Sequence, residues 1–592
     1  MITKSFKNFK NTFRFLIPFL KENRINYFLG IIFLLGADIL QLIMPKVLGI
    51  LTDKLQSYQL NQNDFIYYIA IIFSVAIGVA ICRFSWRMFI FGSSRKLEFS
   101  LRELLFKHLE TLSQTFYHNS TTGDLMAHAT NDIQAVRMAF GGGIVMAVDA
   151  FFLTLSTIFM MAININLTLT LIALIPLPII AILIGLFGPK VQNRFKNVQE
   201  AFSQLTNKVQ ENFSGIRVIK SFVQERNVNN DFCDVNDLNL RKNMNLVKLF
   251  GFMMPMVTFV SSLSFIVALS LGGYMVINLQ ITLGQFVSFV TYLGLLTWPM
   301  MAIGFVVNIL QRGMASMKRI NKILETMPEV TDRAADFSIN DFDGTLEYRN
   351  VSFSYPNSDF PALENISFKL EAGKTLAIVG RTGSGKTTLV NLLLRRFTDY
   401  SGSITIDQTP IEHYPLKILT EKIGYVPQSV FLFSTSIEDN LNFAGLNTTS
   451  DSMEKACSNA MILDEINRFP NGFNTILGEK GVNLSGGQKQ RLSIARALIK
   501  KPRILILDDS LSAVDTSTEE QILYHLNINT NDSSTILIAH RLSTLQNADH
   551  IIVLDEGKII QSGNHEQLVT KNGLYKDLYE KQQLEDILSK EV

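Results

Sequence analysis

The stretch 375–394, TLAIVGRTGSGKTTLVNLLL, decides the fold of the C-terminal half of the chain. From Gly380 to Thr387 it fits the pattern G-x-x-x-x-G-K-[ST], between a short apolar run and an apolar helical stretch. Glycines in that setting let backbone N–H groups converge on phosphates, and the helix N-terminus adds positive potential. The pattern predicts a strand, a phosphate-binding loop and a helix in an α/β domain of the P-loop NTPase class.

The loop side chains have separate expected roles. Lys386 is expected to reach the β and γ oxygens of ATP, and Thr387 to offer its hydroxyl to Mg²⁺. The expected ATP-binding residues of the loop are Gly380, Arg381, Thr382, Gly383, Ser384, Gly385, Lys386, Thr387 and Thr388.

A second acidic element follows downstream, where the apolar run 504–507 ends in Asp508 and Asp509. Such a run predicts a buried parallel strand whose carboxyl end faces the ligand edge of the sheet. Asp508 is expected to hold Mg²⁺, directly or through water. Acidic residues also follow strands that have no binding role. Because a phosphate-binding loop lies upstream, we favour the interpretation as a Mg²⁺ site.

A further glycine-rich segment opens the predicted helix 489–499 with an N-terminus rich in free amides. It consists of Leu484, Ser485, Gly486, Gly487 and Gln488.

Length and composition indicate more than one domain and a contact with lipid. The chain has 592 residues, of which 47% are hydrophobic and 18% charged, which excludes disorder. Its 54 basic and 52 acidic residues leave a net charge of +2, so no nucleic-acid partner is expected. Cys82, Cys233 and Cys457 stand far apart without metal-ligand spacing, which supports neither a disulfide framework nor a zinc site.

Six stretches in the first half are long and apolar enough to cross a hydrocarbon core about 30 Å thick. They run over 27–51, 65–91, 139–163, 167–187, 252–277 and 285–310. After Arg319 the pattern changes to short β-rich runs that alternate with amphipathic helices. The predicted fold class is a six-helix membrane bundle, with long cytoplasmic helical extensions, followed by the α/β P-loop NTPase domain.

Four segments are expected along the chain. Residues 1–26 are predicted to form a cytoplasmic interfacial helix, because an apolar stripe (Phe6, Phe9, Phe13, Leu16, Ile17, Leu20) lies opposite basic residues. The membrane domain is expected at 27–325, an acidic linker at 326–344 and the nucleotide-binding domain at 345–592. Cations are concentrated before the first span, which predicts a cytoplasmic N-terminus.

The connections between spans differ on the two sides of the membrane. The outer turns 164–166 and 278–282 are short and uncharged. Residues 93–138 and 190–248 are expected to form continuous charged helices that reach tens of ångströms into the cytosol.

Ionisable groups inside the spans have two interpretations. Asp38 and Asp149 lie near mid-span, where they would serve either as polar contacts in a substrate cavity or as structural links between helices. Arg83 and Arg87 lie one turn apart near a cytoplasmic end, where snorkelling explains them.

These motifs together resemble the signature of ATP-binding cassette (ABC) proteins, over nearly the whole chain. The resemblance implies further site residues in fixed order. They are Tyr355 for adenine stacking, Gln428 for sensing magnesium, Glu479 in a cross-linking loop, Asp515 in the D-loop and His540 as the switch histidine at the γ-phosphate.

The membrane half resembles six-span ABC exporters as well. The segments 122–125, 131–132 and 214–222, with Arg319–Ile320 after the last span, match the intracellular parts that carry coupling helices in such exporters. Charge-rich runs of this kind also occur as plain solvated helices.

The chain departs from the family pattern at Asp509, where efficient ABC ATPases place glutamate. Loss of one methylene withdraws the carboxylate by about 1 Å, which can cost on the order of 100-fold in rate. The segment 484–488, which closes over ATP held by the opposite subunit in this family, is intact. The pattern therefore favours the less active half of a heterodimeric bacterial multidrug-resistance-like exporter, with a slow homodimer as the alternative.

The expected function is ATP-driven export of small amphiphilic molecules across a bacterial inner membrane, by two half-transporters in a lipid bilayer. The catalytic assignments are Asp509, His540 and Gln428, and the Mg²⁺ assignments are Thr387, Gln428 and Asp508. A lipid or peptide translocase and an ATP-gated channel or regulator are the rival interpretations.

Overall fold

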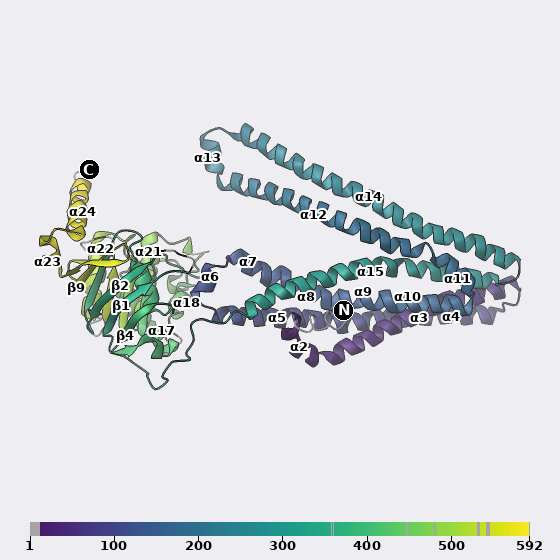
Figure 1. The fold of residues 1–592 in the computed structure, drawn as a ribbon, viewed down its shortest axis with the longest axis horizontal. Helices are drawn as coiled ribbons and strands as arrows, with labels where there is room; N and C mark the ends of the chain where they lie inside the picture. Colours follow the sequence, from purple (N-terminus) through teal and green to yellow (C-terminus); the bar gives the residue numbers. More distant parts are fainter. Residues whose placement is uncertain are drawn as a thin grey trace. The chain divides into compact units, whose positions relative to one another are not determined.

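The structure, a computed structural model, describes residues 12–356, 358, 360–445, 448–478, 481–529, 533–539, 541 and 545–590. The chain forms two compact units (Figure 1). The first consists of Met1–Glu110 and Thr122–Thr326, and the second of Thr111–Thr121 and Met327–Val592. The short segment Thr111–Thr121 thus belongs by its contacts to the second unit, although both its sequence neighbours belong to the first.

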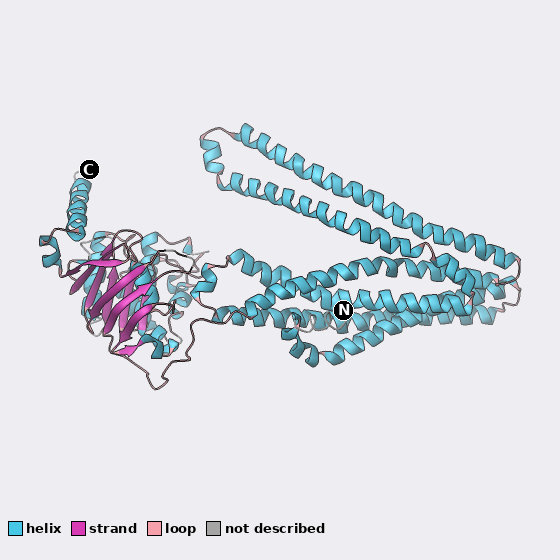
Figure 2. Ribbon diagram, in the orientation of Figure 1, coloured by secondary structure: helices cyan, strands magenta, loops and turns pink. Residues whose placement is uncertain are grey.

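The first unit is entirely helical in its described part (Figure 2). Its elements are η1 (Arg14–Leu16), α2 (Ile17–Glu22), α3 (Arg24–Gln56), α4 (Gln62–Trp86), η2 (Arg87–Phe91), α5 (Gly92–Thr111), α7 (Thr122–Ala127), η3 (His128–Asp132), α8 (Ile133–Met138), η4 (Ala139–Gly143), α9 (Ile144–Val148), η5 (Asp149–Leu153), α10 (Thr154–Asn164), α11 (Leu167–Leu174), α12 (Leu177–Ser214), α13 (Ile216–Ser221), α14 (Glu225–Ile277) and α15 (Leu283–Leu324).

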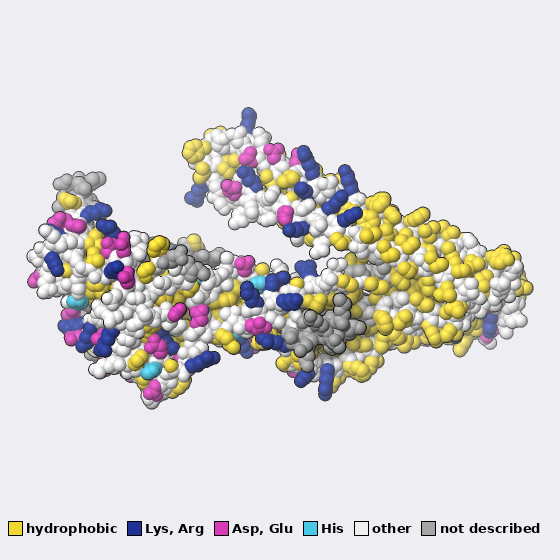
Figure 3. Space-filling model, in the orientation of Figure 1, with side chains coloured by type: hydrophobic (Ala, Val, Ile, Leu, Met, Phe, Trp, Pro, Cys, Tyr) yellow, Lys and Arg dark blue, Asp and Glu magenta, His cyan; other side chains and the backbone are white. Residues whose placement is uncertain are grey.

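Within the described residues, six helical stretches are long and apolar enough to cross a membrane, and each contains one of the six predicted spans. They are Arg24–Gln56, Gln62–Thr111, Thr122–Asn164, Leu167–Ser214, Glu225–Ile277 and Leu283–Leu324. Large apolar side chains such as Phe73, Phe151 and Ile182 are exposed on these helices, and Figure 3 shows a broad apolar surface over them. A surface of that kind requires lipid rather than water as its solvent.

The expectation of continuous helices over 93–138 and 190–248 is wrong. Each connection is a hairpin with a short helix at its tip, namely α6 (Gln114–His118) and α13. Gly215 leaves helical geometry between α12 and α13, and Val223 has a φ of +52° between α13 and α14. These backbone positions end the long helices, and α12 and α14 return side by side as an antiparallel pair (Figure 1).

Only part of the predicted interfacial helix lies within the described residues, and 1–11, which include Phe6 and Phe9, lie outside them. From the predicted stripe, Phe13 and Leu16 are buried, and the Phe13 ring meets Phe140 edge to face at 5.1 Å. The Asn321 amide donates to the Thr12 carbonyl at 2.7 Å. This part of the stripe therefore packs on the unit's own helices.

The described residues of the second unit form two sheets. Its strands are β1 (Leu346–Phe353), β2 (Leu363–Leu370), β3 (Thr375–Gly380), β4 (Ser401–Ile406), β5 (Thr409–Pro410), β6 (Ile423–Val426), β7 (Ile504–Asp508), β8 (Ser534–Ile538), β9 (His550–Asp555) and β10 (Lys558–Gly563). The four-stranded antiparallel sheet has the order β2-β1-β4-β5, and the six-stranded sheet has the order β10-β9-β3-β8-β7-β6. Among the described strands of the six-stranded sheet, β9, β3, β8, β7 and β6 are parallel and β10 runs antiparallel.

Helices and turns of this unit surround the sheets. They are α6, α16 (Lys386–Leu393), η6 (Ile411–His413), α17 (Leu416–Lys422), α18 (Ile437–Asn442), α19 (Ser450–Asn459), α20 (Leu463–Arg468), η7 (Gly472–Asn474), α21 (Gly486–Leu498), α22 (Thr516–Asn529), α23 (His565–Thr570) and α24 (Leu574–Lys590).

The parallel sheet is buried on both faces. Along β3, Leu376 and Ile378 belong to one apolar core, while Ala377 and Val379 belong to the other. Strand side chains alternate between faces, so a sheet covered on both sides needs continuous apolar strands. This explains why the runs before Gly380 and Asp508 are unbroken, and it brings their carboxyl ends to one edge.

Candidate nucleotide-binding site

The phosphate loop joins β3 to α16 through backbone conformations that favour glycine. Gly383 and Gly385 have φ values of +84° and +100°. A Cβ at Gly385 would meet the Ala362 carbonyl oxygen at 2.7 Å. Gly385 also caps the N-terminus of α16, so the first amides of that helix open onto the loop.

Lys386 lies inside the loop, where its ammonium group donates to the Gly380 and Arg381 carbonyls, each at 2.8 Å. The side chain is buried, and desolvation lowers the pKa of Lys386, although Asp508 and Asp509 oppose that shift. Ser384 has a buried hydroxyl with no hydrogen-bond partner among the described residues. An orphaned donor beside a buried ammonium group fits a loop that takes phosphate oxygens.

Thr387 and Asp508 come together at the carboxyl edge of the sheet, as the sequence predicts. The Thr387 hydroxyl donates to Asp508 at 3.3 Å, and the Tyr425 hydroxyl donates to its other oxygen at 3.4 Å. Asp508 is 2% exposed, and this burial raises its pKa. A hydroxyl and a carboxylate at this spacing are the oxygen donors that Mg²⁺ prefers, so the residues fit that ion.

Asp509 and Gln428 form the next contact along the same edge. The Gln428 side-chain amide donates to the Asp509 carboxylate at 3.2 Å. Asp509 has a φ of +48°, and its N–H donates to the Ile538 carbonyl at 2.7 Å. Aspartate is among the residues that tolerate this left-handed conformation best.

Tyr355 stands beside the loop in an aromatic group. Its hydroxyl pairs with the Thr388 hydroxyl at 3.0 Å, and its ring meets Phe353 and Phe397 edge to face at 5.0 Å and 5.3 Å. The Tyr355 side chain is half-buried.

The residues of the 484–488 segment form the start of α21. Ser485 caps the helix by accepting from the Gln488 N–H at 3.2 Å, and the Gln488 side chain accepts from the Ser485 N–H at 2.8 Å. Leu484 is buried in the core, whereas Ser485 and Gly486 are exposed. A Cβ at Gly487 would meet the Ala513 carbonyl oxygen at 2.8 Å. Within the described ranges no hydrogen bond joins this segment to the phosphate loop.

Asp515 accepts hydrogen bonds from the Ser517 hydroxyl at 2.7 Å and the Thr518 N–H at 2.9 Å. These bonds lower the pKa of Asp515 to about 2. The side chain is exposed at the start of α22. In this structure it stabilises the first turn of that helix.

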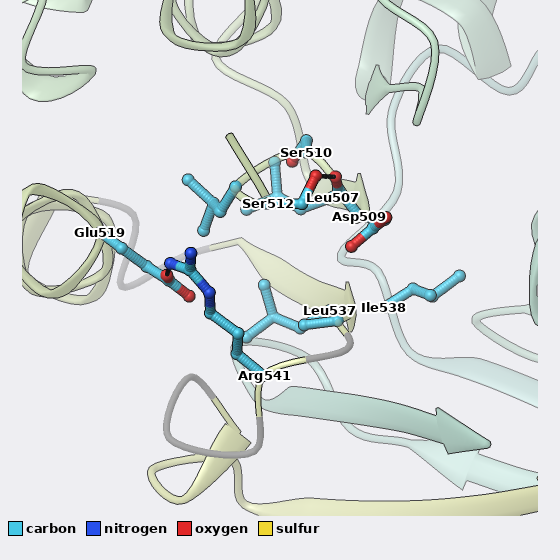
Figure 4. Close-up of a pocket in the computed structure, with 10 residues that line it drawn as sticks. Leu507, Asp509, Ser510, Ser512, Glu519, Leu537, Ile538 and Arg541 are labelled. Carbon is cyan, nitrogen blue, oxygen red and sulfur yellow. Dashed lines mark hydrogen bonds and ion pairs between the residues drawn. The ribbon is translucent and has the colours of Figure 1, made fainter. Parts of the chain in front are cut away.

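Arg541 and Glu519 form an ion pair that no sequence motif predicts. Arg541 donates to Glu519 at 2.8 Å and to the Val514 carbonyl at 2.9 Å. Figure 4 shows the pair on one side of a pocket of about 120 Å³, with Asp509 on the other side. The two residues are 22 positions apart without a motif, so their proximity follows only from the fold.

Two predicted site residues, Glu479 and His540, lie outside the described residues. Their assignments stay predictions.

The chain matches two protein-family models and is similar to several bacterial transporters. Residues 27–300 match the family described as "ABC transporter transmembrane region", and residues 363–512 match "ABC transporter". It is 40% identical over 566 residues to "Probable multidrug resistance ABC transporter ATP-binding/permease protein YheI" of Bacillus subtilis, covering 96% of this chain and 97% of the relative.

Other relatives carry related descriptions. "Multidrug resistance-like ATP-binding protein MdlA" of Escherichia coli is 39% identical over 93% of each chain. The "ATP-dependent lipid A-core flippase" of Syntrophus aciditrophicus is 33% identical over 83% of this chain and 81% of its own.

The fold is similar to that of the solved "Structure of a bacterial Atm1-family ABC exporter with ATP bound", with a TM-score of 0.79. That match covers 95% of this chain and 99% of the other at 24% identity. The chain contains an ABC cassette and is therefore an ATP-binding ATPase coupled to transport. The six apolar helices of its described part show a multi-pass membrane protein. In this family the cassette lies on the cytoplasmic side. Exporters of this kind work as dimers in a lipid bilayer. The chain belongs to the ABC transporter family, as a half-exporter with one transmembrane region and one cassette.

Proposed function

We propose that this chain is the less active half of a heterodimeric exporter of small amphiphilic molecules in a bacterial inner membrane. The observation that carries the proposal is Asp509, which follows the buried Asp508 where efficient ABC ATPases place glutamate. The sequence boundaries proposed for the membrane domain, linker and cassette remain 27–325, 326–344 and 345–592.

The site residues receive the roles that their positions support. Lys386 and the loop amides bind the phosphates, and Tyr355 stacks on adenine. Thr387 and Asp508 hold Mg²⁺ together with Gln428; bound Mg²⁺ neutralises charge on the β and γ oxygens. His540 is assigned to the γ-phosphate.

Asp509 is assigned as the general base of this site, with a short reach. Its carboxylate is one methylene closer to the backbone than a glutamate would place it, and Gln428 engages it at 3.2 Å. A displacement of about 1 Å from the attacking water is enough to slow hydrolysis on the order of 100-fold. The site would therefore bind ATP well and hydrolyse it slowly.

The 484–488 segment supports a role at the partner's ATP site. Ser485 and Gly486 are exposed at the N-terminus of α21, where free amides and the helix dipole attract phosphate. The 484–488 segment is intact although Asp509 is a short general base. This combination is expected when a second chain supplies the efficient general base and its ATP site uses Ser485 of this chain. Two unlike sites of that kind require two unlike chains.

Coupling between ATP and transport is supported by the segment Thr111–Thr121. This segment connects two membrane helices, yet it packs with the cassette unit, where Ser113 donates to Glu329 at 3.0 Å. A change in the cassette would move both attached helices. ATP that binds more tightly to one arrangement of the dimer would thus shift the membrane helices between inward-open and outward-open states.

Lipid translocation is the second candidate, because the Syntrophus relative is described as a lipid A-core flippase. A slow homodimer is the alternative assembly. An ATP-gated channel or regulator shares the same motifs.

One experiment tests these assignments. The tagged chain is purified from its native membrane and its partners are identified by mass spectrometry, and ATP-dependent accumulation of an amphiphilic dye is measured in inside-out vesicles. A co-purified half-transporter with glutamate after its magnesium aspartate, together with accumulation, supports the proposal. Rapid Mg²⁺-dependent ATP turnover by the lone chain would contradict it, and ATP-dependent conductance without accumulation would indicate a channel.

A further inference from the structure

The two acids at the end of β7 each meet a residue from the end of the neighbouring strand β6. Gln428 donates to Asp509 at 3.2 Å, and the Tyr425 hydroxyl donates to Asp508 at 3.4 Å. Gln428 is assigned to the Mg²⁺ site by the family resemblance, and that assignment does not extend to Tyr425. The contact between Tyr425 and Asp508 therefore needs a separate explanation.

The register of the parallel sheet brings Tyr425 and Asp508 to the same face. Tyr425 is the partner of Ile506 in the pair β6–β7, and Asp508 lies two residues beyond Ile506 on its strand. Residues two apart on a strand share a face, and a long aromatic side chain reaches the diagonal neighbour on the next strand. The hydroxyl at the tip of the Tyr425 ring thereby comes level with the Asp508 carboxylate.

Two contacts hold the Tyr425 ring in this position. The ring packs against the apolar core that contains Ile506, and the Arg396 guanidinium lies 4.7 Å from the ring centroid. Arg396 in turn donates to the Asn391 side chain of α16 at 2.8 Å. A phenylalanine would keep the contacts of the ring, so packing alone does not require a hydroxyl at this position.

The Asp508 carboxylate has one hydroxyl donor on each oxygen. Thr387 donates to Oδ1 at 3.3 Å and Tyr425 to Oδ2 at 3.4 Å, and Asp508 is 2% exposed. The Thr387 hydroxyl is itself assigned to Mg²⁺ and therefore belongs to the metal site. Tyr425 engages the carboxylate through the other oxygen, which is the arrangement of a group that supports a metal ligand from behind.

We propose that Tyr425 is a positioning residue for Mg²⁺, whose hydroxyl orients the Asp508 carboxylate so that its Oδ1 atom stays beside Thr387. Groups that hydrogen-bond to a metal ligand fix its orientation, and their loss typically lowers metal affinity about 10- to 100-fold. The inference rests on the proposed assignment of Mg²⁺ to Thr387 and Asp508, and it adds a residue that does not touch the ion.

Metal affinity tests this role without any use of ATP hydrolysis. The purified full chain in lipid nanodiscs is loaded with a non-hydrolysable ATP analogue and titrated with Mn²⁺, and the bound ion is followed by electron paramagnetic resonance. Tyr425→Phe removes only the hydroxyl and should raise the dissociation constant of Mn²⁺ about tenfold. Binding of the nucleotide in EDTA should stay unchanged, because no contact of the phosphate loop is lost.

Two further variants separate the hydroxyl from the packing of the ring. Tyr425→Leu also lacks the hydroxyl but fills less space, and it should lose as much Mn²⁺ affinity as Tyr425→Phe does. Tyr414→Phe is the matched control, because the buried Tyr414 hydroxyl donates to the Ile406 carbonyl at 2.9 Å. Its Mn²⁺ affinity should equal that of the native chain, and nucleotide binding in EDTA reports whether each variant is folded.

Unchanged Mn²⁺ affinity in Tyr425→Phe, a loss in Tyr425→Leu alone, or an equal loss in Tyr414→Phe would each overturn the inference. Asp508→Asn separates it from the metal assignment and should weaken Mn²⁺ binding at least as much as Tyr425→Phe. A loss in Asp508→Asn without one in Tyr425→Phe overturns only the role of Tyr425. No loss in Asp508→Asn overturns the assignment of Mg²⁺ to Asp508 and this inference with it, whereas the export function is tested separately by the partner and vesicle measurements.

Discussion

The Gln428 amide donates to the Asp509 carboxylate across 3.2 Å, just beyond the carboxyl ends of the neighbouring parallel strands β6 and β7. Gln428 is exposed and Asp509 is half-buried with a φ of +48°. The contact therefore joins a residue at the solvent edge of the site to one whose backbone is held in a sparsely populated conformation. A glutamate at position 509 would carry its carboxylate one methylene farther from the backbone than Asp509 does.

Substitution Asp509→Glu should raise the ATP turnover of the purified chain by roughly 10- to 100-fold, because the added methylene restores about 1 Å of reach. Turnover is measured as Mg²⁺-dependent phosphate release in nanodiscs. Lys386→Ala in the Asp509→Glu background is the control and should abolish the gain. An unchanged rate in Asp509→Glu would show that reach does not limit this site.

Removal of the Ser485 hydroxyl should affect the partner's ATP site more than this chain's own site. In the heterodimer, Ser485→Ala should lower total hydrolysis more than Asp509→Ala does, because the faster site borrows Ser485. The substitution also removes a helix cap, which costs about 1 kcal/mol.

The matched control for that cap is Asn564→Ala. Asn564 and Gln567 form the same type of reciprocal capping box at α23. It should lose similar stability in thermal unfolding and keep its hydrolysis rate. Equal losses of hydrolysis in Ser485→Ala and Asp509→Ala would argue against two unlike sites.

Much of the fold was predictable because each part depends on a local pattern. Apolar stretches of roughly 20 residues must be helical in lipid, since every backbone group needs an internal partner there. The unbroken runs before Gly380 and Asp508 indicate strands that are covered on both faces. The site contact between Thr387 and Asp508 follows from the same strand order.

Other features depend on contacts that no local pattern encodes. The helix ends at Gly215 and Val223 lie within charged, helix-favouring sequence, so the expectation of continuous helices was wrong. The pairing of Arg541 with Glu519 and the packing of Phe13 against Phe140 join segments far apart in the chain. Tertiary packing determines these two contacts, and the amino-acid composition carries no information about them.

The nucleotide-free chain should respond to pH in opposite directions through Asp508 and Asp515. Burial raises the pKa of Asp508. The folded chain therefore keeps a proton on Asp508 at pH values above about 3.9, where the unfolded chain has lost it. The free energy of unfolding falls as the pH rises from about 3.9 to the raised pKa of Asp508 in the folded chain. Hydrogen bonds lower the pKa of Asp515 to about 2, so its contribution is complete above about pH 3.9 and is lost as pH falls toward 2.

At pH 7, Asp508→Asn should therefore raise the thermal midpoint of the nucleotide-free chain, and Asp515→Ala should lower it. Differential scanning fluorimetry in nanodiscs measures both. Asp508→Asn should also lose the stabilisation by ATP that depends on Mg²⁺. A lower midpoint in Asp508→Asn would show that this carboxylate stabilises the fold, contrary to its burial.

A polar cluster in the membrane unit should be a larger source of stability than a surface ion pair. Asp132 is buried and accepts from Ser316 at 2.8 Å and from Arg319, and it pairs with His128 at 2.6 Å. Asp132→Ala should cost about 1–3 kcal/mol, because it leaves several donors unpaired. Asp64→Ala, which removes a partly exposed pair with Lys54, should cost less than about 1 kcal/mol. Urea unfolding followed by circular dichroism compares the two, and equal losses would contradict a structural role for the cluster.

The ion pair between Arg541 and Glu519 should stabilise the position of Arg541 after β8. The Glu519 side chain is 4% exposed, so Arg541→Ala leaves a buried carboxylate without this partner and should cost about 1–3 kcal/mol. Glu519→Gln combined with Arg541→Ala should recover part of the loss, because the buried charge is then gone; a double-mutant cycle measures the coupling. Arg541→Lys keeps the charge and should retain most of the stability. If the stability losses of Arg541→Ala and Glu519→Gln simply add in the double variant, the two side chains are not coupled. Other contacts would then determine the position of Arg541 after β8.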